Sequence, residues 1–309
     1  MAALSLSVCL SGQTKVVFCQ QWTPQAQFAG YYVAMEKGFF AEEGIDVEIR
    51  HPGANSTAST EDLLLQGEAD IVGQQLIKSI ISKADGHDIV NVFQLTQESG
   101  LCCVSHEPLD DFNKLDGKRV GRWKAGFSEI CDMLEVYNGI KIEWIPFINS
   151  TNLFIFGAVD AQLCYTYSEL ISLELSTGDV PDENIMKFSE DGYDCPEDGL
   201  YVTRKYYETH KDTIEAFCRA CKRGWTYARN HQDEALDICD KYIREGHIIT
   251  NRTHQKLMLQ EYLKLQVNPA TGLSDCAPVS KDTYDKICDA LLKTGYIVSK
   301  PEYESLIAR

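Results

Sequence analysis

The sequence predicts a two-lobed α/β protein in which each lobe is a parallel-rich sheet flanked by helices. Strand-like and helix-like segments alternate from residue 14 onward, and the alternation restarts after a loop at residues 106–118. A chain of 309 residues is long enough to divide into two cores. Alternation of this kind gives a parallel sheet covered on both faces, with ligand clefts at the carboxyl ends of its strands. We therefore expect a ligand cleft between two lobes.

Apolar spacing and turn residues place the elements of the first lobe. Phe28, Met35 and Phe39 recur at helical spacing before Gly44, which is typical of a helix end. Glu61 and Asp62 favour the start of the next helix, because carboxylates stabilise a first turn. The expected order is strand 14–22, helix 26–44, strand 45–53, helix 55–69, strand 70–75, helix 76–86 and strand 87–97.

The second unit has the same order with shorter segments. The chain is expected to return to the first lobe through a loop and a strand within residues 189–210, and to be helical from Lys211 onward. We accordingly assign residues 1–14 to an N-terminal tail, 15–103 and 201–309 to lobe I, and 104–200 to lobe II. The elements expected in lobe II are strand 118–123, helix 128–139, strand 141–147, helix 149–159 and strand 160–167.

Composition excludes several classes of function. The formal charge of −17 and the pI near 4.8 argue against nucleic acid or an anionic membrane surface as partner, because both attract clustered Lys and Arg. The common phosphate-binding, nucleophile-elbow and zinc-protease motifs are absent. The seven histidines are scattered, and paired acids such as Glu197-Asp198 are typical of loop turns. We predict no enzyme activity, no metal, no cofactor, a small-molecule solute as partner and a monomer.

The first twelve residues resemble the end of an export signal, a short apolar run that reaches small residues and Cys9. Cys9 is a candidate for lipidation, so we expect an exported protein that touches a membrane only through such an anchor; a simple N-terminal tail on a cytoplasmic protein is the alternative. The twelve cysteines show no paired zinc spacing. Cys218 and Cys221 lie on a helical pattern and are interpreted as buried apolar side chains, while Cys102-Cys103 are strand-like. One or two disulfides are compatible with export.

Polar and aromatic residues at strand ends and helix starts are the candidate site. These positions lie at the edge where a parallel sheet binds ligands, and a helix start offers free N–H groups. We expect Gly126 to allow close backbone approach and Ser128 to cap the following helix. The expected ligand contacts are Trp22, Tyr31, Asn55, Gln74, Gln97, Glu98, Trp123, Gly126, Ser128, Tyr165 and Tyr167.

Four motifs in order, QWTPQAQFAGYYVAMEKGFFAEEGIDVEI, GEADIVGQQ, LDGKRVGRWKAGFSE and VDAQLCYTYSE, resemble the solute-binding proteins of nitrate, sulfonate and taurine transporters. Among them the sequence is most similar to the subgroup related to thiamine-pyrimidine precursors. The resemblance covers residues 15–230 and implies a type II periplasmic-binding-protein fold, a small solute and an ABC transporter membrane subunit as partner.

The same subgroup contains fungal-type enzymes that build the thiamine pyrimidine from pyridoxal phosphate and one of their own histidines. By this resemblance Gln74 stands where the enzymes have the pyridoxal-binding lysine, and Lys78 stands where they have the donor histidine. Only Cys195 occupies the region of their cysteine-rich loop. Because glutamine cannot form a Schiff base, the synthase becomes the alternative to the binding protein.

Two ligand classes stay open at this point. An aminopyrimidine would be stacked between Trp22 and either Trp123 or Tyr165, with polar side chains at the ring edge. A sulfonate or nitrate would use helix N–H groups near Asn55 and Ser128, with Arg122 or Lys124. The aromatic content and local acidity favour the uncharged heterocycle.

Overall fold

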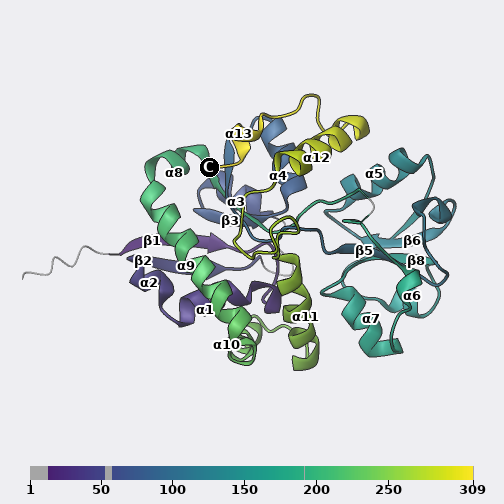
Figure 1. Ribbon diagram of the computed structural model, residues 1–309, viewed down its shortest axis with the longest axis horizontal. Coiled ribbons are helices and arrows are strands. Elements are labelled where there is room, and N and C mark those ends of the chain that lie inside the picture. The colour runs from purple at the N-terminus through teal and green to yellow at the C-terminus, as the bar shows by residue number, and fades with distance from the viewer. Residues whose placement is uncertain (1–12, 53–57, 191, 309) are drawn as a thin grey trace, which may run out of the picture.

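The computed structural model describes residues 13–52, 58–190 and 192–308 and shows two α/β lobes side by side (Figure 1). The sheet of lobe I has the strand order β2-β1-β3-β10-β4, and the sheet of lobe II has the order β7-β6-β8-β5-β9. Each sheet is mixed: β1, β2 and β3 are parallel to one another, whereas β10 runs antiparallel to both β3 and β4. The predicted two-lobed fold with flanking helices is confirmed.

Lobe I is built from the two ends of the described chain. Its strands are β1 (Thr14–Cys19), β2 (Ile45–Arg50), β3 (Ile71–Gln74), β4 (Ile89–Gln94) and β10 (Gly199–Thr203). Its helices are α1 (Ala29–Glu36), α2 (Phe39–Glu42), α3 (Thr60–Gln66), α4 (Leu76–Ala84), α8 (Arg204–Thr209), α9 (Lys211–Asn230), α10 (Gln232–Glu245), α11 (Arg252–Leu265), α12 (Lys281–Thr294) and α13 (Tyr303–Leu306). None of the helices in the described ranges combines the length and apolar character needed to cross a bilayer.

Lobe II contains the middle of the chain. Its strands are β5 (Leu101–Ser105), β6 (Arg119–Trp123), β7 (Glu143–Phe147), β8 (Ala161–Tyr165) and β9 (Ile185–Lys187), and its helices are α5 (Ser128–Asn138), α6 (Asn152–Ile155) and α7 (Glu169–Thr177). The chain leaves lobe I after β4 and returns after β9, so two crossing segments, residues 95–100 and 188–198, join the lobes. Because β5 begins at Leu101, the domain boundary expected at 104 falls inside this strand.

Local chemistry explains where several elements differ from expectation. The helix expected over 26–44 divides into α1 and α2 because Gly38 adopts φ +73°, a left-handed conformation that favours glycine. The helix expected over 149–159 shortens to α6. The helix expected over 55–69 starts at Thr60, where the Ser59 hydroxyl accepts from Asp62 N–H and the Asp62 carboxylate accepts from Ser59 N–H.

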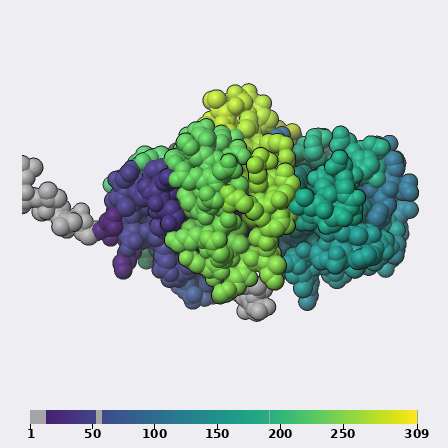
Figure 2. Space-filling view, turned by 90° about the horizontal axis from the view of Figure 1, so that it is seen from below, coloured from purple at the N-terminus to yellow at the C-terminus, as the bar shows by residue number. Residues whose placement is uncertain are grey.

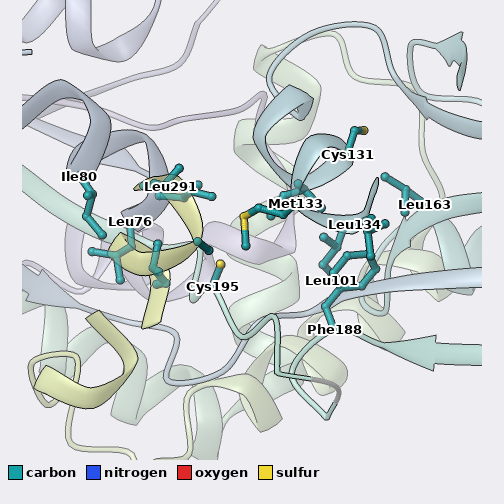
Figure 3. Close-up of a cluster of buried hydrophobic side chains, with 14 of the residues drawn as sticks. Leu76, Ile80, Leu101, Cys131, Met133, Leu134, Leu163, Phe188, Cys195 and Leu291 are labelled. Carbon is teal, nitrogen blue, oxygen red and sulfur yellow. The ribbon is translucent and has the colours of Figure 1, made fainter. Parts of the chain in front are cut away.

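The hydrophobic core continues from one lobe into the other. Leu76, Ile80 and Leu291 of lobe I belong to the same buried cluster as Met133 of α5 and Cys195 of the second crossing segment (Figure 3). In Figure 2 the yellow-green C-terminal part of lobe I abuts the teal surface of lobe II. The lobes are therefore packed against each other rather than held apart on a hinge.

The cysteines act as small apolar side chains in this fold. Cys102 and Cys103 are fully buried in β5; of the C-x-x-C pair on α9, Cys221 is fully buried as predicted, whereas Cys218 is half-buried. All eleven cysteines in the described ranges are free thiols, so the disulfides allowed by the sequence are not formed among them. Cys9 lies outside the described residues.

Candidate functional site

The candidate site lies where the carboxyl ends of the central strands of both lobes meet. In lobe I, β1 and β3 are parallel neighbours and end at Cys19 and Gln74. In lobe II, β6 and β8 are parallel neighbours and end at Trp123 and Tyr165. Gln75 of lobe I contacts Tyr165 of lobe II here, and the fold is expected to bind ligands at this junction, which we call the cleft.

Stacked aromatic rings, which we call the aromatic wall, lie at the lobe II side of this junction; Trp123 and Tyr167 are 8% and 3% exposed, and Tyr165 is half-buried. Trp123 stacks on Phe127 with ring centroids 4.2 Å apart, and its indole lies 5.2 Å from the Tyr165 ring. Tyr165 stacks in turn on Tyr167 at 5.0 Å. Tyr167 contacts Tyr262 of α11 edge to face at 5.2 Å, which carries the aromatic series across to lobe I. Offset and edge-to-face pairs of this kind stabilise by about 0.5 to 1.5 kcal/mol beyond their buried area.

A buried carboxylate fixes the orientation of the aromatic wall. Glu169, at the start of α7, accepts a hydrogen bond from Trp123 Nε1 at 3.3 Å and another from the Tyr165 backbone N–H at 3.1 Å. Burial raises the pKa of Glu169. The Glu169 carboxyl group thus fixes the position of both the Trp123 indole and the end of β8, which carries Tyr165.

Several polar contacts join the lobes, and two of them involve the start of α4. Gln75, which precedes α4, donates through Nε2 to the Tyr165 hydroxyl at 3.1 Å. One turn further along α4, Lys78 forms an ion pair with Glu129 of α5. The first residues of α4 therefore bind lobe II directly, and we call this conformation, in which the lobes are in contact, the closed one.

Three carboxyl groups of the second crossing segment bind neighbouring elements. Glu197 accepts from the Ser99 hydroxyl at 2.5 Å and from the Gly100 N–H at 3.2 Å, and Asp194 accepts from the Ser99 N–H at 2.7 Å. Asp198 accepts from Gln27 Nε2 at 2.8 Å and also from the Tyr262 hydroxyl.

Burial is the main influence on these acids. It raises the pKa of Glu197 to about 8 and the pKa values of Asp194 and Asp198 to about 6. Glu197 and Asp198 are only 4% and 6% exposed, which corrects the expectation of a solvated loop turn. Their carboxyl groups accept hydrogen bonds from residues far away in the sequence, Ser99 and Gln27 among them. The local sequence therefore does not reveal that these acids are buried.

The structure brings four of the predicted residues together at the cleft. Trp123, Tyr165 and Tyr167 form the aromatic wall, and Gln74 ends the strand that leads directly into Gln75 and α4. Gln74 is 6% exposed, and its Nε2 has no hydrogen-bond partner among the described residues.

Trp22 lies outside the aromatic wall. It follows β1 with 48% of its surface exposed and makes no ring contact in the described part of the chain. Its carbonyl accepts a hydrogen bond from His51 Nδ1 at 2.6 Å, while His51 Nε2 lies 2.9 Å from the Tyr32 hydroxyl. Since a carbonyl only accepts, Nδ1 carries the ring proton; burial lowers the His51 pKa to about 4 and keeps the ring neutral. The stacking expected between Trp22 and Trp123 is not present in the closed conformation.

Tyr31 belongs to the core of lobe I. It is 2% exposed and packs edge to face on Phe18 at 5.1 Å and on Trp225 at 5.5 Å, because α1 lies against α9. This placement corrects the expectation that Tyr31 lines the cleft. Asn55 lies outside the described residues.

Gln97 and Glu98 lie in the first crossing segment. Gln97 Nε2 donates to the Gln94 carbonyl at 3.2 Å and to the Ala277 carbonyl at 3.0 Å, so its amide anchors the C-terminal loop. Glu98 is half-buried in the same segment.

Gly126 and Ser128 shape the turn before α5. Gly126 has φ +91°, and a Cβ there would meet nothing within 4 Å, so conformation rather than space requires glycine. Phe127 occupies the N-cap position and Ser128 is the exposed first residue of α5, with no side-chain cap. The expectation that Ser128 caps this helix is wrong, because the helix begins at Ser128 itself, one residue earlier than a cap at Ser128 requires.

Sequence reasoning missed the partners contributed by distant segments. Tyr262, Glu129 and Glu169 lie on three different helices, and each looks like an ordinary helix residue in the sequence. The only local signal was at Gln75, next to the predicted Gln74.

Two surface cavities of about 380 Å³ each lie away from the cleft on lobe I, one beside α3 and α8 and one beside α9. Neither collects buried polar groups.

Comparisons with known proteins agree on the architecture. The chain is similar to YtlA of Bacillus subtilis, with 25% identity over 69% of this chain and 65% of YtlA. It is 28% identical to the 4-amino-5-hydroxymethyl-2-methylpyrimidine phosphate synthase of Uromyces fabae over 68% of this chain and 65% of that protein. It is 23% identical to the riboflavin-binding protein RibY of Chloroflexus aurantiacus over 84% of this chain and 74% of RibY. The chain thus spans about two thirds of the length of the first two.

Among solved structures, the periplasmic aliphatic sulphonate binding protein SsuA of Escherichia coli superimposes with a TM-score of 0.67 at 13% identity, covering 93% of this chain and 94% of SsuA. At this identity the likeness establishes the periplasmic-binding-protein fold alone. The sequence profile described as NMT1/THI5 like matches residues 25–235, more than half of the chain. The protein is therefore a member of the NMT1/THI5-like family.

Proposed function

We propose that the protein is the solute-binding component of an ABC importer and binds a small, flat, uncharged heterocycle, an aminopyrimidine related to thiamine precursors, between its lobes. The observation that carries the proposal is the aromatic wall of Trp123, Tyr165 and Tyr167 at the strand ends of lobe II. Such a wall suits a planar ring, and the neighbouring amides suit hydrogen bonds at the ring edge.

The relatives support a heterocyclic ligand. The synthases in the family make an aminopyrimidine phosphate, and RibY binds riboflavin, by their names. We extend a ligand of this ring type to the present chain. Export, lipidation of Cys9, a monomeric state and contact with a transporter membrane subunit belong to the same proposal.

An anion such as a sulfonate is the second candidate, and one observation favours it. Arg122 Nε, at the end of β6, is buried and has no hydrogen-bond partner among the described residues, and Lys124 nearby is exposed. Against it, the buried carboxyls Glu169 and Asp198 lie at the same edge and would repel an anion wherever they are ionised.

A pyridoxal-phosphate-dependent pyrimidine synthase is the third candidate, because synthases are among the relatives. Gln74 has no amine, and Lys78 is engaged with Glu129. Adding pyridoxal phosphate and recording the absorbance spectrum separates this candidate from the first two. We expect no Schiff-base band; a band that disappears on substitution of a single lysine would establish the enzyme instead.

A further inference from the structure

Two glutamines flank the end of β3, the central strand of lobe I. Gln74 is the last residue of β3, and Gln20 directly follows the parallel neighbour β1. A Cβ built on Gly73 would lie 3.6 Å from Gln20 Oε1 and 3.8 Å from Gln20 Cα, so the Gln20 side chain lies over Gly73. Because successive side chains of a strand point to opposite faces, Gln74 points to the other face. The two amides thus flank this strand end from both sides.

Both amides are buried with an unused donor. Gln20 is 1% exposed and Gln74 is 6% exposed, and the Nε2 of each has no hydrogen-bond partner among the described residues. An unpaired buried donor costs free energy, so folded chains retain few of them.

Three of the four other buried glutamines of lobe I have paired Nε2 donors; the fourth, Gln266, has an unpaired Nε2 within the described structure, although its Oε1 accepts from Arg229. Gln27 donates to Asp198 at 2.8 Å, Gln94 donates to the Thr96 carbonyl at 3.1 Å, and Gln255 donates to the Thr250 hydroxyl at 3.0 Å. The fold can therefore pair a buried amide donor in this lobe, and it is the occurrence of two open donors together at one strand end that argues for a ligand.

We infer that Gln20 and Gln74 donate hydrogen bonds through Nε2 to acceptor atoms of the bound solute, and that these acceptors are uncharged. The inference rests on the proposed function and specifies it further: the solute presents a carbonyl oxygen or an unprotonated ring nitrogen to each side of the end of β3. A neutral amide pairs with such an acceptor without a compensating charge.

The groups around this strand end disfavour an anionic acceptor at the same position. Gln74 is in register with Gly199, the first residue of β10, so Asp198 and Glu197 of the crossing segment adjoin the end of β3. The cation on the following helix, Lys78, is already paired with Glu129. A phosphate or sulfonate at the two amides would meet carboxyl groups and no free cation from these elements.

Substitution with leucine separates a ligand contact from a structural one. In the ligand-free protein, Gln20→Leu and Gln74→Leu remove an unpaired donor and should leave the Tm unchanged or raise it. Gln255→Leu is the matched control: it removes an amide whose Oε1 accepts from Ala26 N–H and whose Nε2 is also paired, so its Tm should fall. A fall in Tm for Gln20→Leu and Gln74→Leu equal to that of the control would overturn the inference.

Binding gives the second test, with 4-amino-5-hydroxymethyl-2-methylpyrimidine as the probe in titration calorimetry. Each leucine variant should weaken binding about five- to tenfold, the loss of one hydrogen bond. Gln20→Glu and Gln74→Glu, which keep the shape and replace donors with acceptors, should weaken it at least as much. Unchanged affinity in all four variants contradicts the inference. If the parent protein binds no probe, the proposed ligand fails, and the Tm comparison still decides the role of the two glutamines.

Discussion

Lys78 and Glu129, one from each lobe, form an ion pair that crosses the cleft beside the aromatic wall. The side chain of Glu129 is 9% exposed and its Oε2 has no hydrogen-bond partner within the described structure, whereas Lys78 is 30% exposed. The carboxylate therefore depends on this one ammonium group, and the pair holds α4 of lobe I to α5 of lobe II.

Lys78→Met should destabilise the protein by about 1 to 3 kcal/mol, less than for a fully buried pair because Lys78 reaches solvent. The double variant Lys78→Met/Glu129→Met should recover most of this loss. The control is Lys141→Met, which breaks a pair with Glu135 on the surface of lobe II and should cost under about 1 kcal/mol. Chemical denaturation measures all three; equal losses for the two single variants would refute the special role of the cleft pair.

Tyr165→Phe tests the second contact across the cleft. The change keeps the ring that stacks on Trp123 and removes the acceptor of Gln75 Nε2, so the closed state loses about 1 kcal/mol. We expect a larger radius of gyration in small-angle X-ray scattering and about fivefold weaker binding of the aminopyrimidine probe. Tyr137→Phe, on the exposed side of α5, is the control and should change neither quantity. An unchanged radius and affinity in Tyr165→Phe would show that this bond does not hold the lobes together.

Trp22→Ala tests whether this half-exposed ring joins the ligand. Since Trp22 contacts no other ring in the described closed state, its removal should leave the ligand-free Tm nearly unchanged. If the tryptophan covers the bound heterocycle, affinity should fall about three- to tenfold, the energy of one aromatic pair. Trp144→Ala, on the edge strand β7 away from the cleft, is the control for affinity. Equal affinity of Trp22→Ala and the parent would remove Trp22 from the site.

Glu197 makes stability depend on pH in a definite direction. Its folded-state pKa of about 8 lies above its ordinary value of 4.5, so the folded chain binds this proton more tightly than the unfolded chain. The stability it contributes is complete below about pH 4.5 and is lost as the pH rises toward 8, at a limiting slope of about 1.4 kcal/mol per pH unit.

Glu197→Gln imitates the protonated acid. Its free energy of unfolding should equal that of the parent protein near pH 5 and should be larger than that of the parent at pH 8. The matched control is Glu190→Gln, an exposed acid of the same crossing segment. Thermal unfolding across this range gives the comparison. A parent and a Glu197→Gln variant whose stabilities change in parallel would show that Glu197 is not the titrating group.

The fold was predictable because its evidence is local. Strand and helix patterns carry the order of elements, and the return strand expected within residues 189–210 is observed as β10. Short elements were not predictable: β9 has three residues, too few for a periodic pattern. The division of the helix at Gly38 depends on a backbone angle that the apolar spacing does not encode.

The candidate site was predictable only where it lies at a strand end. Trp123 and Tyr165 were found because the carboxyl ends of parallel strands bind ligands. Tyr31 was misplaced because an aromatic residue at helical spacing fits a core and a cleft equally well. Tyr262 was missed because α11 reaches the cleft from a distant part of the chain.

The central claim is that a neutral aminopyrimidine binds between the lobes, and a thermal-shift screen tests it most directly. The screen compares 4-amino-5-hydroxymethyl-2-methylpyrimidine, taurine and nitrate with the parent protein and with Trp123→Ala, because specific binding raises the Tm by mass action. We expect the pyrimidine alone to raise the Tm of the parent, and the shift to be lost in Trp123→Ala. A screen in which only taurine or nitrate raises the Tm would contradict the account.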